Sequence, residues 1–185
     1  PVRAGPVEAD SRTRGTPVDR LTAILARADT TDQVIAAADA KIGYPPMRVW
    51  GVPAAGLWAH RLGDQRAKRL LFTGDCLTGA QAAEWGLAVE APAPEDLDER
   101  TERLVERIAA VPVNQLIMVK LAMNSALYNQ GVANSAMIST VFDGIARHTP
   151  EGHAFVAQSR EHGFREAVRQ RDEPFGDYGR KTSGV

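Results

Sequence analysis

DQVIAAADAKIGYPPMRVWGVPAAGLWAHRLGDQRAKRLLFTGDCLTGAQAAEWGLA, residues 32–88, is the stretch that decides the fold. Its apolar run over residues 34–37 opens with two β-branched residues and predicts a strand. A second short strand is predicted over residues 41–44. The adjacent prolines Pro45 and Pro46 then exclude both a helix and a central sheet position. Residues 44–53 are therefore expected to form an irregular, exposed loop, the kind of segment that carries functional groups.

After this loop the chain is expected to be mainly helical. Thr78 is a suitable N-cap and Gly86 a suitable C-terminal residue for one short helix over residues 78–85. The segment 113–128 is apolar on almost every side, so we expect it to be buried, either in the chain or between subunits. A short strand is expected at residues 88–90. The other predicted helices cover residues 17–29, 54–62, 64–72, 95–110 and 149–171. One more helix is predicted around residues 137–145, whose apolar residues recur at helical spacing.

Composition sets broad limits on what the protein does. A chain of 185 residues can bury roughly 70% of its unfolded surface as one domain. A formal net charge of −1 provides no general attraction to nucleic acid or acidic membranes. No apolar run approaches the ~20 residues of a membrane span, and Cys76 is the single cysteine. We therefore expect a cytoplasmic protein with no metal site and with neither nucleic acid nor membrane as a partner.

Residues 32–176 resemble the enoyl-CoA hydratase/isomerase (crotonase) family, and specifically the second half of its fold. Asp32, the apolar run, Asp39-Ala40 and Gly43 follow the family's order leading into its active-site loop. Gly51-Val52-Pro53 resembles the turn that follows this loop. Further similar positions are Arg61-Leu62, Thr73-Gly74-Asp75, Ala80, Ala83, Gly86 and Leu87, and, near the C-terminus, Gly163, Arg171, Pro174 and Phe175.

The resemblance implies an α/β fold of the ClpP/crotonase spiral type, incomplete in this chain. Few short strands would be followed by a predominantly helical C-terminal region. Residues 1–16 are rich in proline, arginine, glycine and small polar residues, so we expect a disordered tail there. The resemblance then implies a partial crotonase-like core over residues 17–93 and a helical oligomerisation region over residues 94–185. The family typically forms trimers, often paired into hexamers, so a homotrimer or hexamer is expected.

The resemblance also implies an acyl-CoA thioester as the substrate or ligand, with no cofactor other than the coenzyme A of that substrate. Its binding residues would lie in the loop between the second strand and the first helix of the quoted stretch. For Tyr44 and Trp50, core packing and contact with an acyl chain are equally expected. The predicted substrate-binding residues are Tyr44, Pro45, Pro46, Met47, Trp50 and Gly51.

Two parts of the family's hydratase chemistry are not found. Hydratases of this family use two glutamates, and the position of one of them is occupied by Pro46, which cannot titrate. A thioester enolate also needs preorganised N–H donors, each worth about 3 kcal/mol. In the family one donor comes from a glycine-rich loop shortly before Asp32, where residues 21–31 read LTAILARADTT. We therefore assign no catalytic residue.

Three interpretations of this deficit stay open. The chain is a fragment or the product of a shifted reading frame, or a member of the family that catalyses a reaction other than hydration, or a non-catalytic assembly protein. Under each of them we expect no enoyl-CoA hydratase activity from this chain.

Overall fold

The computed structural model describes residues 32–52 and 55–176. The predicted tail over residues 1–16 and the predicted helix over residues 17–29 lie outside them. The described elements are β1 (Lys41–Gly43), η1 (Pro45–Arg48), α2 (Ala55–Leu62), α3 (Asp64–Thr73), β2 (Cys76–Thr78), α4 (Gly79–Glu84), η2 (Pro94–Asp96), α5 (Leu97–Ala109), α6 (Val113–Asn129), α7 (Val132–Ala146), α8 (Pro150–His162), α9 (Phe164–Asp172) and η3 (Glu173–Phe175), where η marks a 3-10 helix.

The two strands pair antiparallel, with Lys41 opposite Thr78 and Gly43 opposite Cys76. The predicted strand at residues 41–44 is therefore confirmed, whereas β2 was not predicted. The predicted strands at residues 34–37 and 88–90 are wrong as strands. The two segments run side by side in a single parallel bridge between Ile35 and Glu90. The Val89 N–H donates to the Val34 carbonyl at 2.8 Å and the Ala36 N–H to the Glu90 carbonyl at 3.2 Å, but this pairing is too short to form a strand.

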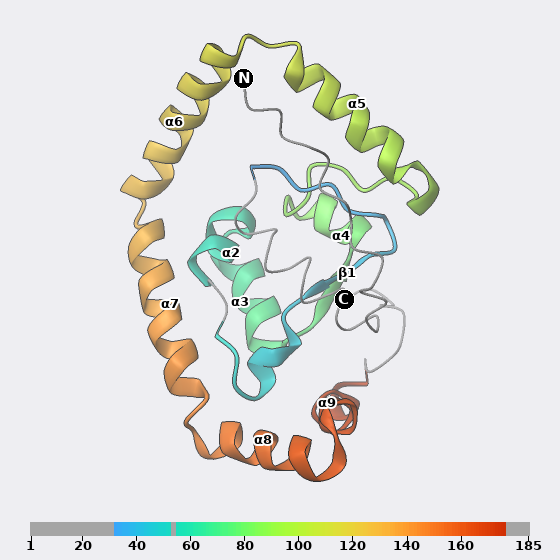
Figure 1. Ribbon diagram of the computed structural model, residues 1–185, viewed down its shortest axis with the longest axis vertical. Coiled ribbons are helices and arrows are strands. Elements are labelled where there is room, and N and C mark those ends of the chain that lie inside the picture. Colours follow the sequence, from blue (N-terminus) through green and yellow to red (C-terminus); the bar gives the residue numbers. More distant parts are fainter. Residues whose placement is uncertain (1–31, 53–54, 177–185) are drawn as a thin grey trace.

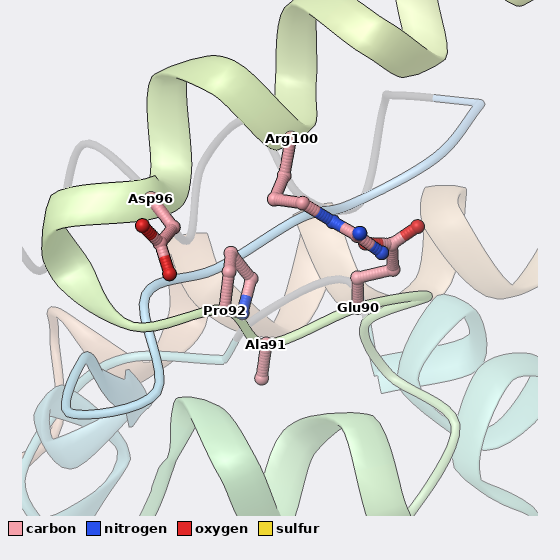
Figure 2. Close-up of a pocket in the computed structure, with 5 residues that line it drawn as sticks. All are labelled: Glu90, Ala91, Pro92, Asp96 and Arg100. Atoms are coloured by element: carbon pink, nitrogen blue, oxygen red, sulfur yellow. The ribbon is translucent and has the colours of Figure 1, made fainter.

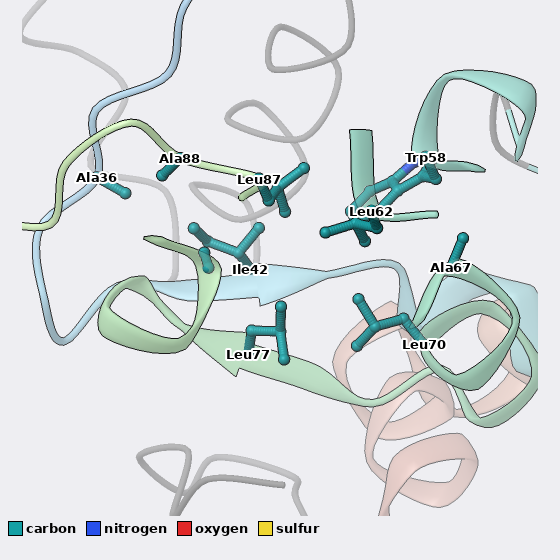
Figure 3. Packing of buried hydrophobic residues seen from close by; sticks show 10 residues of the cluster. Ala36, Ile42, Trp58, Leu62, Ala67, Leu70, Leu77, Leu87 and Ala88 are labelled. Carbon is teal, nitrogen blue, oxygen red and sulfur yellow. The ribbon is translucent and has the colours of Figure 1, made fainter. Parts of the chain in front are cut away.

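A compact hydrophobic core lies where β1, β2, α2, α3 and α4 meet (Figure 3). Ile42, Leu70 and Leu77 are almost completely buried in it. Burial of one such side chain contributes roughly 1.5–3 kcal/mol of hydrophobic free energy. The remaining buried members of this cluster are Ala36, Trp58, Leu62, Ala67, Ala82, Leu87 and Ala88.

The short helix α4 begins and ends as the sequence predicts. The Thr78 hydroxyl accepts a hydrogen bond from the Gln81 backbone N–H at 3.1 Å, and the Gln81 side chain accepts one from the Thr78 N–H at 2.9 Å. Gly86 follows the helix with φ of 85°, a conformation that suits glycine. These local signals fix the position of α4 on the core.

The later helices form an open arc around this core, from α5 through α6 and α7 to α8 and α9 (Figure 1). Helix α7 packs against α2, and α8 packs against α9. The prediction of one helix over residues 149–171 is wrong, because Gly163 at φ 88° and ψ 150° interrupts it. Glycine reaches this conformation easily, and it ends the helical hydrogen-bond pattern.

Helix α6 confirms the helix predicted over residues 113–128. Its predicted burial is not found within the described part of this single chain. Val119 is 55% exposed, Leu121 64% and Met123 65%. No residue of α6 is buried within the described part of the chain. Helix α7 continues the arc from the end of α6 and does not lie along its side, so most of the apolar surface of α6 stays exposed within the described chain (Figure 1).

Candidate functional site

The loop at residues 44–52 is more ordered than the sequence suggests. Pro45 and Pro46 begin the 3-10 helix η1, so the expectation of no helix was wrong. Proline fits the first turn of a helix because N–H groups there have no partner within the helix. The Pro46 carbonyl accepts hydrogen bonds from the N–H groups of Val49, Trp50 and Gly51 at 3.2, 3.1 and 3.0 Å. The whole loop is half-buried, not exposed as predicted.

Three of the predicted binding residues, Tyr44, Pro46 and Gly51, come together at the base of this loop. A Cβ atom on Gly51 would lie 2.8 Å from Tyr44 Cε1 and 3.0 Å from Pro46 Cβ. Only glycine leaves room for this close approach. Pro45 and Met47 lie half-buried in the same turn.

Trp50 packs against the C-terminal helices. Its ring stacks on that of Phe155 in α8, with centroids 5.7 Å apart and an angle of 27° between the planes. The Arg147 guanidinium lies 5.0 Å from the Trp50 ring centroid, within the range of a cation–π interaction. Both Trp50 and Tyr44 thus have packing partners, and their contact with a substrate stays a prediction.

Asp143 of α7 anchors the end of the loop. Its carboxylate accepts a hydrogen bond from the Val52 N–H at 3.0 Å and pairs with Arg147 at 2.7 Å. Burial raises the pKa of the Tyr44 hydroxyl above 10.0, the Asp143 charge raises it further, and Arg147 opposes the change. The phenol therefore keeps its proton at neutral pH and can donate a hydrogen bond.

Arg48 ties the loop to two other parts of the chain. Its side chain is only 2% exposed. Nε donates to the Thr73 carbonyl at 2.9 Å, Nη1 pairs with Asp172 at 3.1 Å, and Nη2 lies 3.6 Å from Asp75. The guanidinium carbon lies 3.9 Å from the centre of the Phe175 ring. Arg48 thus joins η1 to the end of α3 and to η3.

A second cation completes this buried charge cluster. Arg171 pairs with the same carboxylate, with its Nη2 and Nε each 2.7 Å from an Asp172 oxygen. Arg171 and Asp172 are 6% and 10% exposed. The role of Arg48 is not evident from the sequence, because its partner Asp172 lies 124 positions away. The one available signal was a lone charge between two apolar residues in the loop.

The chemistry available at the loop follows from its ionisable groups. Among residues 44–52 only Tyr44 and Arg48 carry ionisable side chains, and the guanidinium stays charged at physiological pH. The loop therefore offers apolar surface and hydrogen-bond donors, but no general base. The described residues include no group of three or more His, Cys, Asp or Glu side chains that could hold a metal ion. No described helix is both long and apolar enough to cross a bilayer.

A pocket of about 400 Å³ lies elsewhere, beside the start of α5 (Figure 2). Its charged groups are Asp96 on one side and, on the other, Arg100 paired with Glu90 at 2.7 Å. Ala91 and Pro92 complete the lining. The pocket shares no residue with the 44–52 loop, and no pattern in the sequence predicts it.

The family model for enoyl-CoA hydratase/isomerase matches residues 26–166. The chain therefore belongs to the enoyl-CoA hydratase/isomerase family. The expected crotonase-like α/β fold, incomplete and mainly helical, is confirmed by the solved structures that resemble it.

A crystal structure of enoyl-CoA hydratase from Mycobacterium smegmatis is 85% identical, with a TM-score of 0.82, and the match covers 85% of this chain and 54% of that one. An enoyl-CoA hydratase/isomerase from Xanthobacter autotrophicus Py2 is 27% identical, with a TM-score of 0.73, over 80% of this chain and 56% of that one. The 1,2-epoxyphenylacetyl-CoA isomerase of Escherichia coli is 33% identical over 101 residues, which are 53% of this chain and 38% of that protein. The chain thus spans between about a third and a little over half of these relatives.

Proposed function

We propose that this chain binds an acyl-CoA thioester along the 44–52 loop and does not hydrate it. The observation that carries the proposal is the composition of the loop. By the resemblance of the loop to the family, Pro46 occupies the position of a glutamate in the family's hydratases, and the loop's two ionisable side chains are both hydrogen-bond donors at neutral pH. Hydration of an enoyl thioester needs groups that accept and return a proton at neutral pH.

The loop has the properties of one wall of an acyl site. Pro46, Met47 and Trp50 are half-buried and supply apolar surface next to the polar Tyr44 hydroxyl. Ligand pockets typically combine such apolar lining with a few polar groups that fix orientation. The names of the relatives agree with this chemistry, because the Escherichia coli protein is an isomerase of a CoA thioester. Coenzyme A enters as part of the ligand, and no other cofactor is proposed.

Titration calorimetry with crotonyl-CoA and with free coenzyme A tests the binding site. We expect saturable heat with crotonyl-CoA. The variant Met47→Asp should weaken that binding about tenfold or more, because it places a charge against the acyl chain. The matched control is Val105→Asp on α5, where the residue is already 57% exposed and lies outside the 44–52 loop. Absence of saturable heat, or equal weakening by both variants, would refute the proposed site.

A second candidate function, self-assembly, is favoured by the apolar surfaces of α6 and α7. Leu121 and Met123 on α6, and Met137 and Phe142 on α7, are each more than half exposed. Contiguous exposed apolar patches on soluble proteins mark interaction sites. We propose that copies of the chain associate through these two helices, in keeping with the trimer or hexamer expected from the family.

Sedimentation velocity over a range of concentrations tests this assembly. The unchanged chain should form oligomers, and Leu121→Glu combined with Phe142→Glu should yield monomers. The control variant Arg107→Glu changes a charge on α5, away from the apolar surface, and should leave the oligomers intact. A chain that is monomeric at every concentration would contradict the assembly. Oligomers without saturable crotonyl-CoA heat would identify a pure assembly protein.

A further inference from the structure

We infer that Arg48 is a positioning residue that makes the conformation of the 44–52 loop depend on the docking of residues 172–175. That the loop is an acyl-CoA site rests on the function proposed above. The dependence itself rests on contacts that Arg48 makes on both sides.

The nitrogens of the Arg48 guanidinium contact residues in separate segments of the chain. One nitrogen donates to the last residue of α3, a second pairs with Asp172 at the end of α9, and the third faces Asp75. The Phe175 ring covers the guanidinium at 3.9 Å. A planar guanidinium has donors in a fixed geometry that suits several partners at once, whereas a lysine ammonium offers a single point charge. Arg48 therefore connects three segments that are far apart in the sequence.

The Arg48 side chain is buried, partly by residues 172–175. Arg48 is 2% exposed, and residues 172–175 supply both Asp172 and the covering ring. If this segment moves away, the guanidinium loses a carboxylate and becomes accessible to water. Water then competes with Thr73 and Asp75 for the guanidinium donors, so the side chain is no longer held in one position. Two of the three residues that donate to the Pro46 carbonyl, Val49 and Trp50, follow Arg48 directly in the chain and would shift with it.

The Arg48 side chain also has little free space around it. A Cβ atom on Gly74 would lie 2.8 Å from both Cγ and Nε of Arg48. The side chain is thus enclosed by Gly74 on one side and by Phe175 on another. With so little free space, a change at residues 172–175 has to displace Arg48 and the loop that carries it.

Fluorine NMR of the full chain labelled with 5-fluorotryptophan tests the dependence. The chain has three tryptophans, Trp50, Trp58 and Trp85, so substitution of each by phenylalanine assigns the resonances. Two variants perturb the contact from opposite sides: Arg48→Lys retains the charge, and Phe175→Leu changes a residue that is 52% exposed. The matched control is Phe72→Leu, on the 75% exposed surface of α3.

We expect the Trp50 resonance to shift in both variants, and the Trp58 and Trp85 resonances to stay in place. The control should shift none of them. A purely structural ion pair would lower the unfolding temperature without this selective shift. An unchanged Trp50 resonance in both Arg48→Lys and Phe175→Leu would overturn the inference.

Crotonyl-CoA affinity provides the second measurement. Phe175→Leu should weaken binding about threefold, the size expected from loss of one cation–π contact. Arg48→Lys should weaken it more, and Phe72→Leu not at all. If the unchanged chain binds no crotonyl-CoA, the proposed function fails. In that case the Trp50 resonance alone decides the inference, because a shift supports it and an unchanged position overturns it.

Discussion

Tyr44 and Arg48 are the ionisable side chains of the 44–52 loop, and they have different surroundings. Burial and the nearby Asp143 charge raise the pKa of Tyr44. Arg48 is a guanidinium held by carboxylates and a carbonyl. Both residues are therefore hydrogen-bond donors at neutral pH. With Pro46 between them, the loop has no side chain that could remove a proton at neutral pH.

The raised pKa of Tyr44 predicts how stability depends on pH. Above the ordinary tyrosine value of 10.0 the unfolded chain loses the phenol proton while the folded chain retains it. Stability is therefore fully present below that pH and is lost as pH rises through the folded pKa. Urea unfolding at several alkaline pH values should show this loss, and Tyr44→Phe should make it smaller. The control Tyr128→Phe, on the 64% exposed surface of α6, should leave the loss unchanged.

Alanine variants of two glycines can distinguish the cost of backbone strain from the cost of contact with Arg48. Gly74 (φ 68°, ψ 18°) and Gly131 (φ 84°, ψ 18°) have similar left-handed conformations. A Cβ atom at Gly131 would meet no atom within 4 Å, whereas at Gly74 it would meet the Arg48 side chain. Each alanine variant should lose roughly 1–2 kcal/mol of unfolding free energy from strain.

Gly74→Ala should lose roughly a further 1–3 kcal/mol, the usual cost of overpacking a tight site. Chemical denaturation of both alanine variants measures the difference. Equal losses in the two variants would show that Arg48 moves aside at little cost, and would contradict its confinement.

The sequence predicts residues whose partners are close in the chain. Thr78 as a helix cap depends on Gln81, three positions away, and was predicted correctly. Arg48 depends on Asp75 and Asp172, and no local pattern connects these positions. The position of the 44–52 loop in the chain was therefore predicted from sequence, while the charge cluster that holds it was not.

For helices and strands too, the predictions succeeded where the deciding contacts are close in the chain and failed where they are distant. Helices α2, α3 and α4 follow from local apolar spacing and caps. The strands β1 and β2 are three residues long, and their pairing joins segments more than 30 positions apart, so the sequence revealed only β1. The helix predicted over residues 149–171 is divided because the apolar pattern continues through Gly163 while its backbone does not.

Helix α9 carries a pH-dependent contact of its own. Hydrogen bonds from Arg169, at 2.5 and 2.8 Å, and then from Gln170 lower the pKa of Glu166 to about 2. The stability that results is present above the ordinary pKa of 4.5 and is lost as pH falls toward 2. Glu166→Gln should flatten the fall of the unfolding free energy in this range. Glu151→Gln on α8 is the control, and an equal effect of the two variants would contradict the assignment.

At the level of the whole molecule, the core and the helical arc around it (Figure 1) differ in how well their apolar side chains are buried. The core around Ile42, Leu70 and Leu77 is buried within the chain. The arc exposes apolar side chains of α6 and α7, although the sequence led us to expect α6 to be buried. A periodic apolar pattern predicts that a helix has a partner, but it does not identify whether that partner lies in the same chain.

Saturation-transfer NMR of crotonyl-CoA with the pure chain tests the central claim most directly, because one sample reports both binding and hydration. We expect transfer to the protons of the crotonyl group, and no signals of a hydroxyacyl product over the course of the experiment. Transfer should weaken in the Met47→Asp variant. Accumulation of hydroxyacyl-CoA at a rate proportional to protein concentration, or absence of any transfer, would contradict the claim that this chain binds an acyl-CoA thioester without hydrating it.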